Sequence, residues 1–436
     1  MSYLRHLSSA AGAAKRVVIV DGTRIPFALS STIYKDKMAV DLAQMAIRGL
    51  LNKTALDAGS LDYMLWGNVL MEPRTSNIAR EASVNAGVPN HVASHTVTQA
   101  CISANQAICT GAEKILAGQA DIVLAGGCET FSDVPIRYSK PVRQRLIAAP
   151  KAMKKGAAGV MGLLKGLKLK DLAPEAPQIA NFTTGEVMGH SSDRLAAKFG
   201  VTRAECDEFA LASHQKAAAA HKAGLYDAEI TPVGGSTAEN GIKGDSTLEK
   251  LASLKPAFVK PHGTHTAANS SFLTDGAAAT LIMSEAKALE LGYKPKAYIK
   301  SWAFVAVDPF EELLLGPTYA SAKALAQAGL ELSDVDCLEL HEAFAGQVLA
   351  NIAAMGSDQF ARDHLGRSAK VGEVDHAKLN LLGGSLSLGH PFGATGSRLV
   401  LTAANRLQRD NQKFALLAAC ADGGLGHACV LERYDN

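Results

Sequence analysis

The sequence predicts an α/β protein made of two similar halves, with a mostly helical region inserted into the first half. Three observations support this prediction. Apolar runs typical of buried strands alternate with helical segments, stretches from the first third of the chain have counterparts near its end, and the region between them matches neither. Alternating strands and helices favour sheets that are covered on both faces. Two such halves, packed together, would place their equivalent loops around one shared cleft.

The first half contains a strand–helix–strand unit with a cysteine at its first junction. The β-branched segment "SHTV" predicts a short strand, apolar residues recur at helical spacing from Ile102 to Leu116, and "DIVLAGG" predicts a second buried strand. Cys101 lies between the first strand and the helix. A thiol at the first turn of a helix lies near the positive end of the helix dipole, which favours the thiolate. A buried structural cysteine is the alternative interpretation, because free cysteine is often buried.

Two pairs of segments indicate an internal duplication. "LDAGSLDYMLWGNVL" resembles "LELSDVDCLELHEAF", with Asp62 opposite Asp336 and an apolar strand after each. "AGQADIVLAGGCE" resembles "DNQKFALLAACADGG", each with a polar turn, an apolar run and small residues. A helical segment precedes each member of this second pair, from Ile102 to Leu116 and from Ser397 to Leu407. The matching order predicts equivalent strands and helices in the two halves.

The region from about Val134 to His265 carries helices such as "TRAECDEFALASHQKAAAAHKAG" and one unusually basic stretch. Between Arg137 and Lys170 there is no acidic residue, and apolar residues recur along two predicted helices split near Pro150. Such a basic amphipathic hairpin indicates a surface for anionic lipid headgroups or for a phosphorylated ligand. A solvated helical face is the alternative. The basic residues of the stretch are Arg137, Lys140, Arg143, Arg145, Lys151, Lys154, Lys155, Lys165, Lys168 and Lys170.

The composition excludes several classes of protein. Charged residues make up 20% of the 436 residues and the net charge is only +2, so nothing points to a nucleic-acid partner. No run of eighteen apolar residues predicts a membrane-spanning helix. The 7 cysteines form an odd set without a C-x-x-C pair, which argues against a disulfide framework and a structural zinc site, and for a reducing compartment.

The two ends of the sequence can carry signals that direct a protein to an organelle. The first twenty residues are rich in serine and alanine and contain Arg5, His6, Lys15 and Arg16 but no acidic residue. This composition predicts a short organelle transit segment over residues 1–15, with a frayed terminus as the alternative. The final "ERYDN" is not a peroxisomal Ser-Lys-Leu address.

Three more reactive side chains lie at strand ends or in glycine-rich turns of the second half. They are His341 in "LHEAFAGQ", His390 in "GGSLSLGHPFGATGSR" and Cys420 in "CADGGLGHACVLE". Glycine at such places permits tight turns and close approach of a ligand to the backbone. "GHPFGATG" lacks the Lys-Ser/Thr ending of a phosphate-binding loop, so a nucleoside triphosphatase is rejected. Each histidine alone could be structural, but the four side chains at matching places of a duplicated chain favour a common site.

The blocks "QACISANQAI", "HEAFAGQ", "GHPFGATG" and "CADGGLGHA" resemble, in order, the four active-site blocks of the thiolases. The resemblance covers the chain from about Lys15 onward. It implies the thiolase fold: two five-stranded βαβαβαββ halves forming a layered α/β/α/β/α core, with a loop domain inserted in the first. The expected organisation is 16–133 for the N-terminal half, completed by 266–290, then 134–265 for the loop domain with the basic hairpin 137–170, and 291–436 for the C-terminal half.

The resemblance also implies the chemistry, which is thiolytic cleavage of a 3-ketoacyl-CoA. Cys101 is the expected nucleophile, His390 the base that takes its proton, and Cys420 the acid that protonates the departing enolate and activates coenzyme A. One oxyanion hole is expected from His390 and a water held by His341. The other is expected from the backbone N–H groups of Cys101 and Asp422. Many thiolases have glycine or alanine at the latter position, and a carboxylate there is unfavourable unless it points away.

Ligand contacts follow from the same resemblance. "THTAANSSFLTDGAA" is similar to the loop that touches pantetheine, with Ser271 at the matching serine, and Met188 matches a methionine of the acyl–pantetheine pocket. A loop serine and a core methionine are the alternatives. No metal or cofactor is expected, since coenzyme A is a substrate and the enzyme thiol forms the covalent bond. A ketoacyl synthase and an inactive scaffold on a thiolase frame remain alternatives, and Cys420 disfavours the first.

Within the family, His341 in place of a common asparagine and the basic insertion resemble the thiolase subunits of mitochondrial trifunctional β-oxidation complexes. This subgroup implies long-chain substrates and a homodimeric core joined to an α-subunit with hydratase and dehydrogenase activities. It also implies a place on the matrix side of the inner membrane, with peripheral contact to anionic lipid.

Overall fold

The strands form one mixed sheet whose order explains how distant parts of the chain meet. The computed structural model describes residues 15–178 and 180–435, so the predicted transit-like segment lies outside the described residues except for Lys15. The strand order is β4-β3-β5-β6-β1-β7-β10-β9-β8, and β2 pairs with β6. The strands are β1 (Val17–Arg24), β2 (Ala28–Leu29), β3 (Tyr63–Gly67), β4 (Ala93–Val97), β5 (Ile122–Glu129), β6 (Thr274–Ser284), β7 (Ala297–Ala306), β8 (Cys337–Leu340), β9 (Phe414–Ala421) and β10 (Leu425–Arg433).

The helices pack on the faces of this sheet, and two of them lie between its two halves. They are α1 (Ala39–Thr54), α2 (Ile78–Ala86), α3 (Ser103–Leu116), α4 (Lys140–Met153), α5 (Gly156–Leu164), α6 (Met188–Lys198), α7 (Arg203–Lys222), α8 (Leu248–Ala252), α9 (Glu285–Glu290), α10 (Gly316–Ala328), α11 (Ala345–Met355), α12 (Asp358–His364), α13 (Ser385–Leu388) and α14 (Thr395–Arg409). Within the described ranges, no helix has the length and apolar character required to cross a bilayer.

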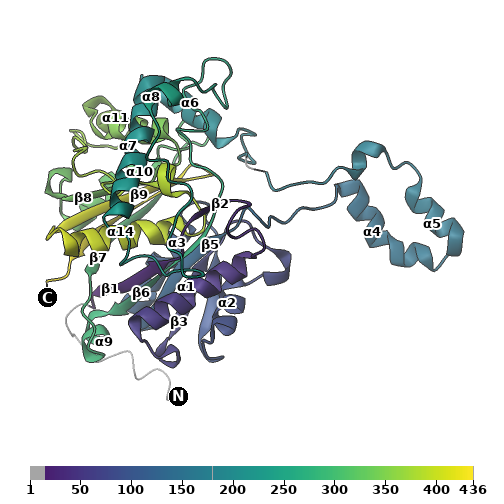
Figure 1. Ribbon diagram of the computed structural model, residues 1–436, viewed down its shortest axis with the longest axis horizontal. Helices are drawn as coiled ribbons and strands as arrows, with labels where there is room; N and C mark the ends of the chain where they lie inside the picture. Colours follow the sequence, from purple (N-terminus) through teal and green to yellow (C-terminus); the bar gives the residue numbers. More distant parts are fainter. Residues whose placement is uncertain (1–14, 179, 436) are drawn as a thin grey trace.

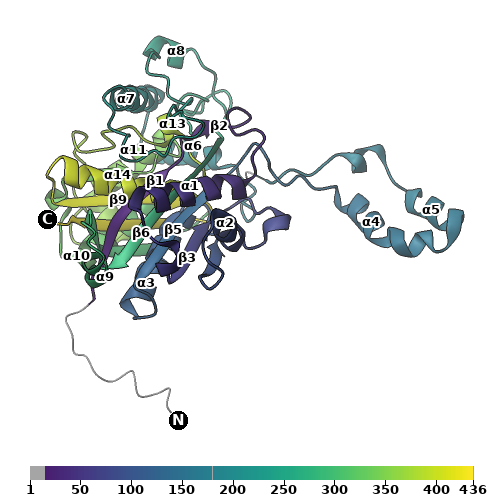
Figure 2. The ribbon, with the colours of Figure 1, turned by 60° about the horizontal axis from the view of Figure 1, so that its bottom comes forward.

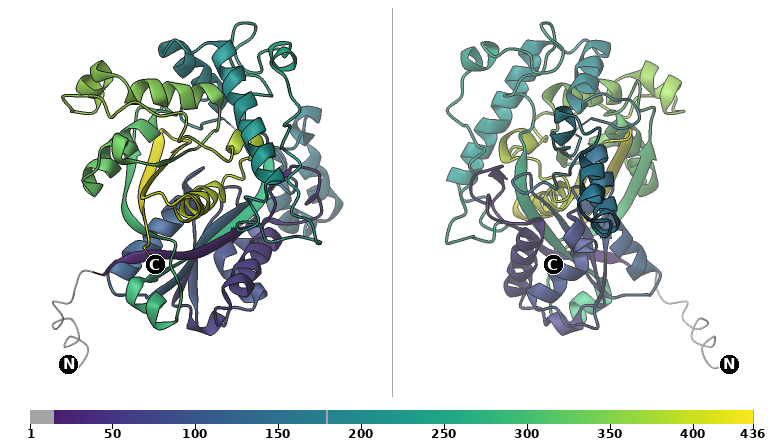
Figure 3. Two further views of the ribbon diagram at one scale, coloured as in Figure 1. Left: turned by 60° about the vertical axis from the view of Figure 1, so that its left-hand side comes forward. Right: turned by 90° about the vertical axis from the view of Figure 1, so that its right-hand side faces the viewer.

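The layers follow from where apolar side chains are buried. Helices α3 and α14 pack against strands of both halves in one core cluster, which includes Ile108, Leu399 and Leu417. A second cluster joins α1 and α2 to the opposite face of the first half, and a third joins α10 and α11 to the second half. The two central helices therefore lie between two half-sheets with further helices outside, and the yellow α14 lies near the middle of the molecule in Figures 1 and 3. This arrangement confirms the predicted layered α/β core.

The internal duplication is visible in matching hydrogen bonds. Before β3, the carboxylate of Asp62 accepts from the backbone N–H groups of Asp121 and Ile122, at 2.7 and 2.9 Å. Before β8, the carboxylate of Asp336 accepts from the N–H groups of Lys413 and Phe414, at 2.8 and 3.2 Å. The same residue type thus ties the same two strands together in each half, as the aligned segments predict.

The second half departs from the expected five strands. It has four strands, and next to β8 there is only a single parallel bridge between Leu338 and Leu379. The reason lies in Asn380, which has a positive φ of 46°. Its side-chain amide accepts from the N–H of Leu340 and donates to the carbonyl of Leu340, at 2.9 and 2.8 Å. Backbone hydrogen bonds join Leu338 to Lys378 and Asn380, and at Leu340 the Asn380 side chain replaces the backbone ladder.

The basic stretch forms a helical hairpin that projects from the body on two extended segments (Figures 1 and 2). Helices α4 and α5 have no buried residue. The two predicted helices are present, and they separate after Met153, slightly beyond Pro150, which lies inside α4. The helix ends where Gly156 adopts a φ of 68°. At the base of the hairpin, Arg137 and Glu175 exchange two backbone hydrogen bonds of 2.9 and 2.7 Å.

Candidate active site

Cys101 lies in a tight turn between β4 and α3. Ala100 has a positive φ of 46°, which is uncommon for a residue with a side chain. Ser103 stabilises the turn, since its hydroxyl accepts from the N–H of Gln99 at 2.8 Å and donates to the carbonyl of Ala100 at 2.7 Å. The helix begins at Ser103, so Cys101 precedes the first helical turn instead of lying in it. The turn presents the thiol at the junction of the two halves.

Glycines let the loop that carries His390 approach the first half. A Cβ atom on Gly127, in β5, would lie 1.8 Å from the carbonyl oxygen of Gly393, and one on Gly393 would lie 2.4 Å from the carbonyl oxygen of Cys128. Glu129, at the end of β5, is fully buried and accepts from the N–H of Gly393 at 3.1 Å. The loop is therefore held against the half that carries Cys101.

One cavity brings together most of the predicted site residues. It has a volume of about 210 Å³, and its lining includes three aromatic residues, Phe258, Phe344 and Phe392. A fourth phenylalanine, Phe272, also lines it, together with Cys101, Met188, Ser271, His390, Cys420 and Asp422. The two cysteines come from opposite halves of the duplicated chain and face one space. His341 is not in this lining but lies directly behind it, with its ring centroid 4.2 Å from that of His390.

The thiol of Cys101 is held in its neutral form. Burial, together with the nearby carboxylate of Asp422, raises its pKa to about 12. The backbone N–H groups of Asp422 and of Cys101 itself oppose this rise by donating toward the sulfur. The expectation that the helix end favours a thiolate is therefore wrong in the free protein, since burial outweighs the dipole. Deprotonation requires a base at the moment of reaction.

Asp422 has a defined orientation beside the cavity. Its carboxylate accepts from the side-chain amide of Asn181 at 2.6 Å and from the N–H of Gly423 at 2.7 Å. The negative charge of this carboxylate raises the pKa of Cys101, and the hydrogen bond from Asn181 stabilises that charge. The backbone N–H groups of Asp422 and Cys101 both lower the pKa of the thiol, so both lie near its sulfur.

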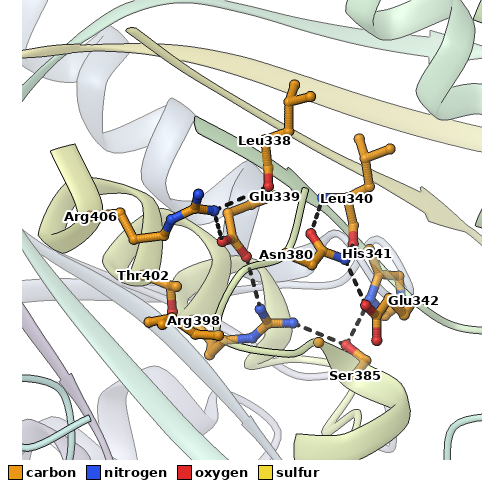
Figure 4. A network of polar contacts seen from close by, with 12 residues as sticks. Leu338, Glu339, Leu340, His341, Glu342, Asn380, Ser385, Arg398, Thr402 and Arg406 are labelled. Atoms are coloured by element: carbon orange, nitrogen blue, oxygen red, sulfur yellow. Dashed lines mark hydrogen bonds and ion pairs between the residues drawn. The ribbon is translucent and has the colours of Figure 1, made fainter. Parts of the chain in front are cut away.

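The two histidines have different hydrogen-bond partners. Nδ1 of His390 lies 2.7 Å from the hydroxyl of Thr395, which donates to the carbonyl of Pro391 at 3.1 Å. Nδ1 of His341 lies 3.0 Å from the hydroxyl of Ser385 (Figure 4). Burial and the charge of Arg398 lower the pKa of His390 to about 3, and burial, His390 and Arg398 lower the pKa of His341. Both rings are therefore neutral. In the described part of the chain, the Nε2 atom of each is buried without a partner.

A second cavity of about 290 Å³ adjoins the first. Both cavities are lined by Cys101, Met188, Leu273, Phe392 and Asp422. The second extends to residues at the base of the projecting hairpin, which are Phe131, Val134, Ala176, Pro177 and Gln178. An apolar space therefore leads from the thiol toward the hairpin.

Comparison with known proteins places the chain in a family. Residues 17–286 match the thiolase N-terminal domain and residues 293–433 match the thiolase C-terminal domain. The chain belongs to the thiolase family. It is 54% identical to the mouse (Mus musculus) mitochondrial trifunctional enzyme subunit beta, over 96% of this chain and 89% of that protein. It is 52% identical to a probable 3-ketoacyl-CoA thiolase of Caenorhabditis elegans, over 96% and 94%. The crystal structure of human mitochondrial 3-ketoacyl-CoA thiolase superposes with a TM-score of 0.81 at 29% identity, covering 97% of this chain and all of that one.

In this thiolase, several residues that shape the site were not predicted. Glu129 accepts from the N–H groups of Val69 and Leu70 as well as from that of Gly393. Ser385 and Asn181 contact His341 and Asp422. Ser385 lies within "GGSLSLGHPFGATGSR", so its nearness to His390 in sequence is a usable signal. Asn181 and Glu129 carry none, because their partners are far away along the chain.

Proposed function

We propose that this thiolase cleaves long-chain 3-ketoacyl-CoA with coenzyme A, giving acetyl-CoA and a shortened acyl-CoA in fatty-acid β-oxidation. The observation that carries the proposal is the single cavity lined by Cys101, His390 and Cys420, which come from both halves of the chain. Two thiols and a neutral imidazole around one space supply a nucleophile, a base and a second proton donor. The enzyme is an acyltransferase that acts through an acyl-cysteine.

In the first half-reaction, Sγ of Cys101 forms a bond to the 3-keto carbon while its proton passes to Nε2 of His390. The bond between carbons 2 and 3 then breaks, and the acetyl-CoA enolate takes a proton from the thiol of Cys420. His390 suits the role of base because its Nδ1 donates to the Thr395 hydroxyl, which leaves the lone pair of Nε2 free. The product is acetyl-CoA, and the shortened acyl group stays on Cys101.

In the second half-reaction, the Cys420 thiolate takes the proton of coenzyme A. The coenzyme A sulfur attacks the thioester carbonyl, the bond to Cys101 breaks, and Cys101 regains its proton from His390. The backbone N–H groups of Cys101 and Asp422 stabilise charge on the thioester oxygen, and His390 with a water on His341 serves the other oxyanion. Loss of one such donor typically costs about 2.7–4 kcal/mol of barrier.

Two further residues and the second cavity are assigned to parts of the acyl-CoA substrate. Ser271 and Met188 line the first cavity, which supports their roles beside the pantetheine and the acyl thioester. The acyl tail occupies the second cavity, because that apolar space starts at Cys101 and runs toward the hairpin. The thiols carry the covalent chemistry, so the proposed reaction uses no metal and no cofactor, and coenzyme A is a substrate.

The proposal extends to partners and location. Relatives named as mitochondrial trifunctional enzyme beta subunits support a hetero-oligomer in the mitochondrion. Within it, the proposal places a homodimeric core beside an α-subunit with hydratase and dehydrogenase activities, on the matrix side of the inner membrane. The hairpin supports contact with anionic lipid, since apolar side chains such as Ile147 and Met161 are 80% and 67% exposed among its basic residues.

The function is tested by mixing the protein with 3-ketopalmitoyl-CoA and coenzyme A and measuring acetyl-CoA, then repeating the assay with shorter acyl chains. Without coenzyme A, mass spectrometry should find an acyl thioester on Cys101. Cys101→Ser should abolish both signals. Cys109→Ala is the matched control, because Cys109 is buried in α3 and lines neither cavity. It should keep full turnover.

Two outcomes would overturn this assignment. Activity that depends on a malonyl thioester would identify a ketoacyl synthase. Absence of any acyl group on Cys101 in the folded protein would identify an inactive scaffold.

A further inference from the structure

A buried polar chain leads to His341, which is not part of the cavity lining (Figure 4). Arg406, on α14, donates to Glu339 at 2.7 Å, and Glu339 lies 3.6 Å from the guanidinium of Arg398. Arg398 in turn donates to the hydroxyl of Ser385 at 3.0 Å, and that hydroxyl lies 3.0 Å from Nδ1 of His341. Every member of the chain is at most 1% exposed. The mechanism above gives Ser385 and Arg398 no role.

The direction of these hydrogen bonds is fixed by chemistry. A guanidinium can only donate, so the oxygen of Ser385 accepts from Arg398. In the described part of the chain, Nδ1 of His341 is the one acceptor within reach of the Ser385 hydroxyl proton. A buried hydroxyl that left this proton unpaired would lose free energy. Ser385 therefore donates to Nδ1, and the proton of the neutral His341 ring must lie on Nε2.

We propose that Ser385 and Arg398 are positioning residues that hold His341 as a neutral imidazole with its proton on Nε2. In this tautomer Nε2 is a donor, as is needed to bind the water of the first oxyanion hole. His390, whose Nδ1 faces Thr395, is held in the opposite tautomer and keeps Nε2 as an acceptor. Of these two neighbouring histidines, His341 thus serves as the donor and His390 as the base. This inference rests on the proposed function.

The charge of Arg398 serves a second purpose in this arrangement. The guanidinium charge acts on both rings and lowers the pKa of each. Both rings are therefore neutral in the resting protein. Glu339 contacts both buried guanidinium groups, those of Arg398 and Arg406. The buried carboxylate of Glu342 also interacts with Arg398, and it accepts hydrogen bonds from Ser213, Asn380 and the N–H of Leu386.

The test compares Ser385→Ala with Ser387→Ala. Ser387 lies on the same short helix and is equally buried, but its hydroxyl contacts Ser213 and Gly384. Ser385→Ala should lower kcat roughly tenfold to a hundredfold with little change in KM, up to the range seen when an oxyanion donor is lost. Ser387→Ala should keep kcat within about twofold. In a His341→Ala background, Ser385→Ala should cost nothing further, since its effect passes through that ring.

Nitrogen-15 NMR of the histidine rings in the resting protein gives a readout that needs no activity. The wild-type His341 ring, assigned from its loss in His341→Ala, should show a protonated Nε2 and an unprotonated Nδ1, and Ser385→Ala should shift the proton toward Nδ1. A protonated Nδ1 in the wild type, or equal losses of kcat for Ser385→Ala with and without His341, would overturn the inference. Failure of wild-type thiolysis would instead overturn the proposed function and leave the tautomer result standing.

Discussion

At the residue scale, the main feature is a nucleophile that is stored as a thiol. Burial and the Asp422 carboxylate raise the pKa of Cys101, while two backbone N–H groups directed at the sulfur lower it. The neutral thiol is protected from chance oxidation and alkylation, because the thiolate is the reactive form. Substrate and His390 must then act together to deprotonate it.

Replacing Asp422 by asparagine tests this balance. The variant keeps the oxygen that accepts from Asn181 but removes the negative charge, so the pKa of Cys101 should fall. A fall of one unit gives about tenfold more thiolate at any pH below the pKa. The rate of iodoacetamide labelling at pH 8.5 should rise by up to about that factor. Cys101→Ser provides the background rate, and an unchanged or slower labelling would show that the carboxylate does not act on the sulfur.

The sequence predicts that Cys101, His390 and Cys420 share one site, since each lies at a strand end or in a turn, and one cavity brings the three side chains together. It does not predict the environment of Asp422. The side chain that orients it, Asn181, is 241 residues away in the sequence and belongs to the inserted region. The raised pKa of Cys101 was likewise missed, because desolvation depends on the complete cavity and not on the neighbouring helix.

At the element scale, the position of the His390 loop depends on a close backbone contact with β5. Gly127 faces the carbonyl of Gly393 so closely that no side-chain atom fits between them. Elements such as α3, α14 and β5 could be predicted from apolar periodicity. The continuation of α4 through Pro150 could not be predicted, because proline usually ends a helix. The missing strand beside β8 could not either, since it depends on the side-chain hydrogen bonds of Asn380.

The substitution Gly127→Ala should force the His390 loop away from β5. We expect a loss of roughly 2–4 kcal/mol in the free energy of unfolding, comparable to other severe core substitutions, and a fall in kcat. Chemical denaturation measures the first effect. Gly162→Ala is the matched control, because a Cβ there meets nothing within 4 Å and alanine favours the α5 helix. A Gly127→Ala protein as stable as the control would contradict the close contact.

At the scale of the whole molecule, the hairpin and the catalytic body are separate. Helices α4 and α5 bury no residue, and the backbone pairing of Arg137 with Glu175 closes the base of the hairpin. The exposed apolar side chains of the hairpin therefore have no role in the stability of the body. Contact with a lipid surface would explain their exposure.

Deleting residues 142–169 should abolish binding to vesicles that contain cardiolipin, measured by co-sedimentation, and leave short-chain turnover unchanged. The thermal midpoint of the body should move by less than about 2 °C, since no buried contact is lost. Vesicles of neutral lipid are the control and should bind neither form. Persistent binding of the truncated protein to cardiolipin vesicles would contradict the proposed lipid contact.

The strand order has a consequence for how this chain acquires its shape. β1 pairs with β6 and β7, and β6 separates β1 from β5 in the sheet. Within the described residues, β1 is the first strand to be made, and apart from a bridge between Arg24 and Ile230 it has no strand neighbour until β6 follows. Helix α1 can cover its Val18 and Val20 side chains early, but the backbone edges of β1 stay unpaired until then. Non-local pairing of this kind slows folding and exposes the nascent chain to aggregation. Chaperones that shield the N-terminal third should therefore govern the yield of this protein.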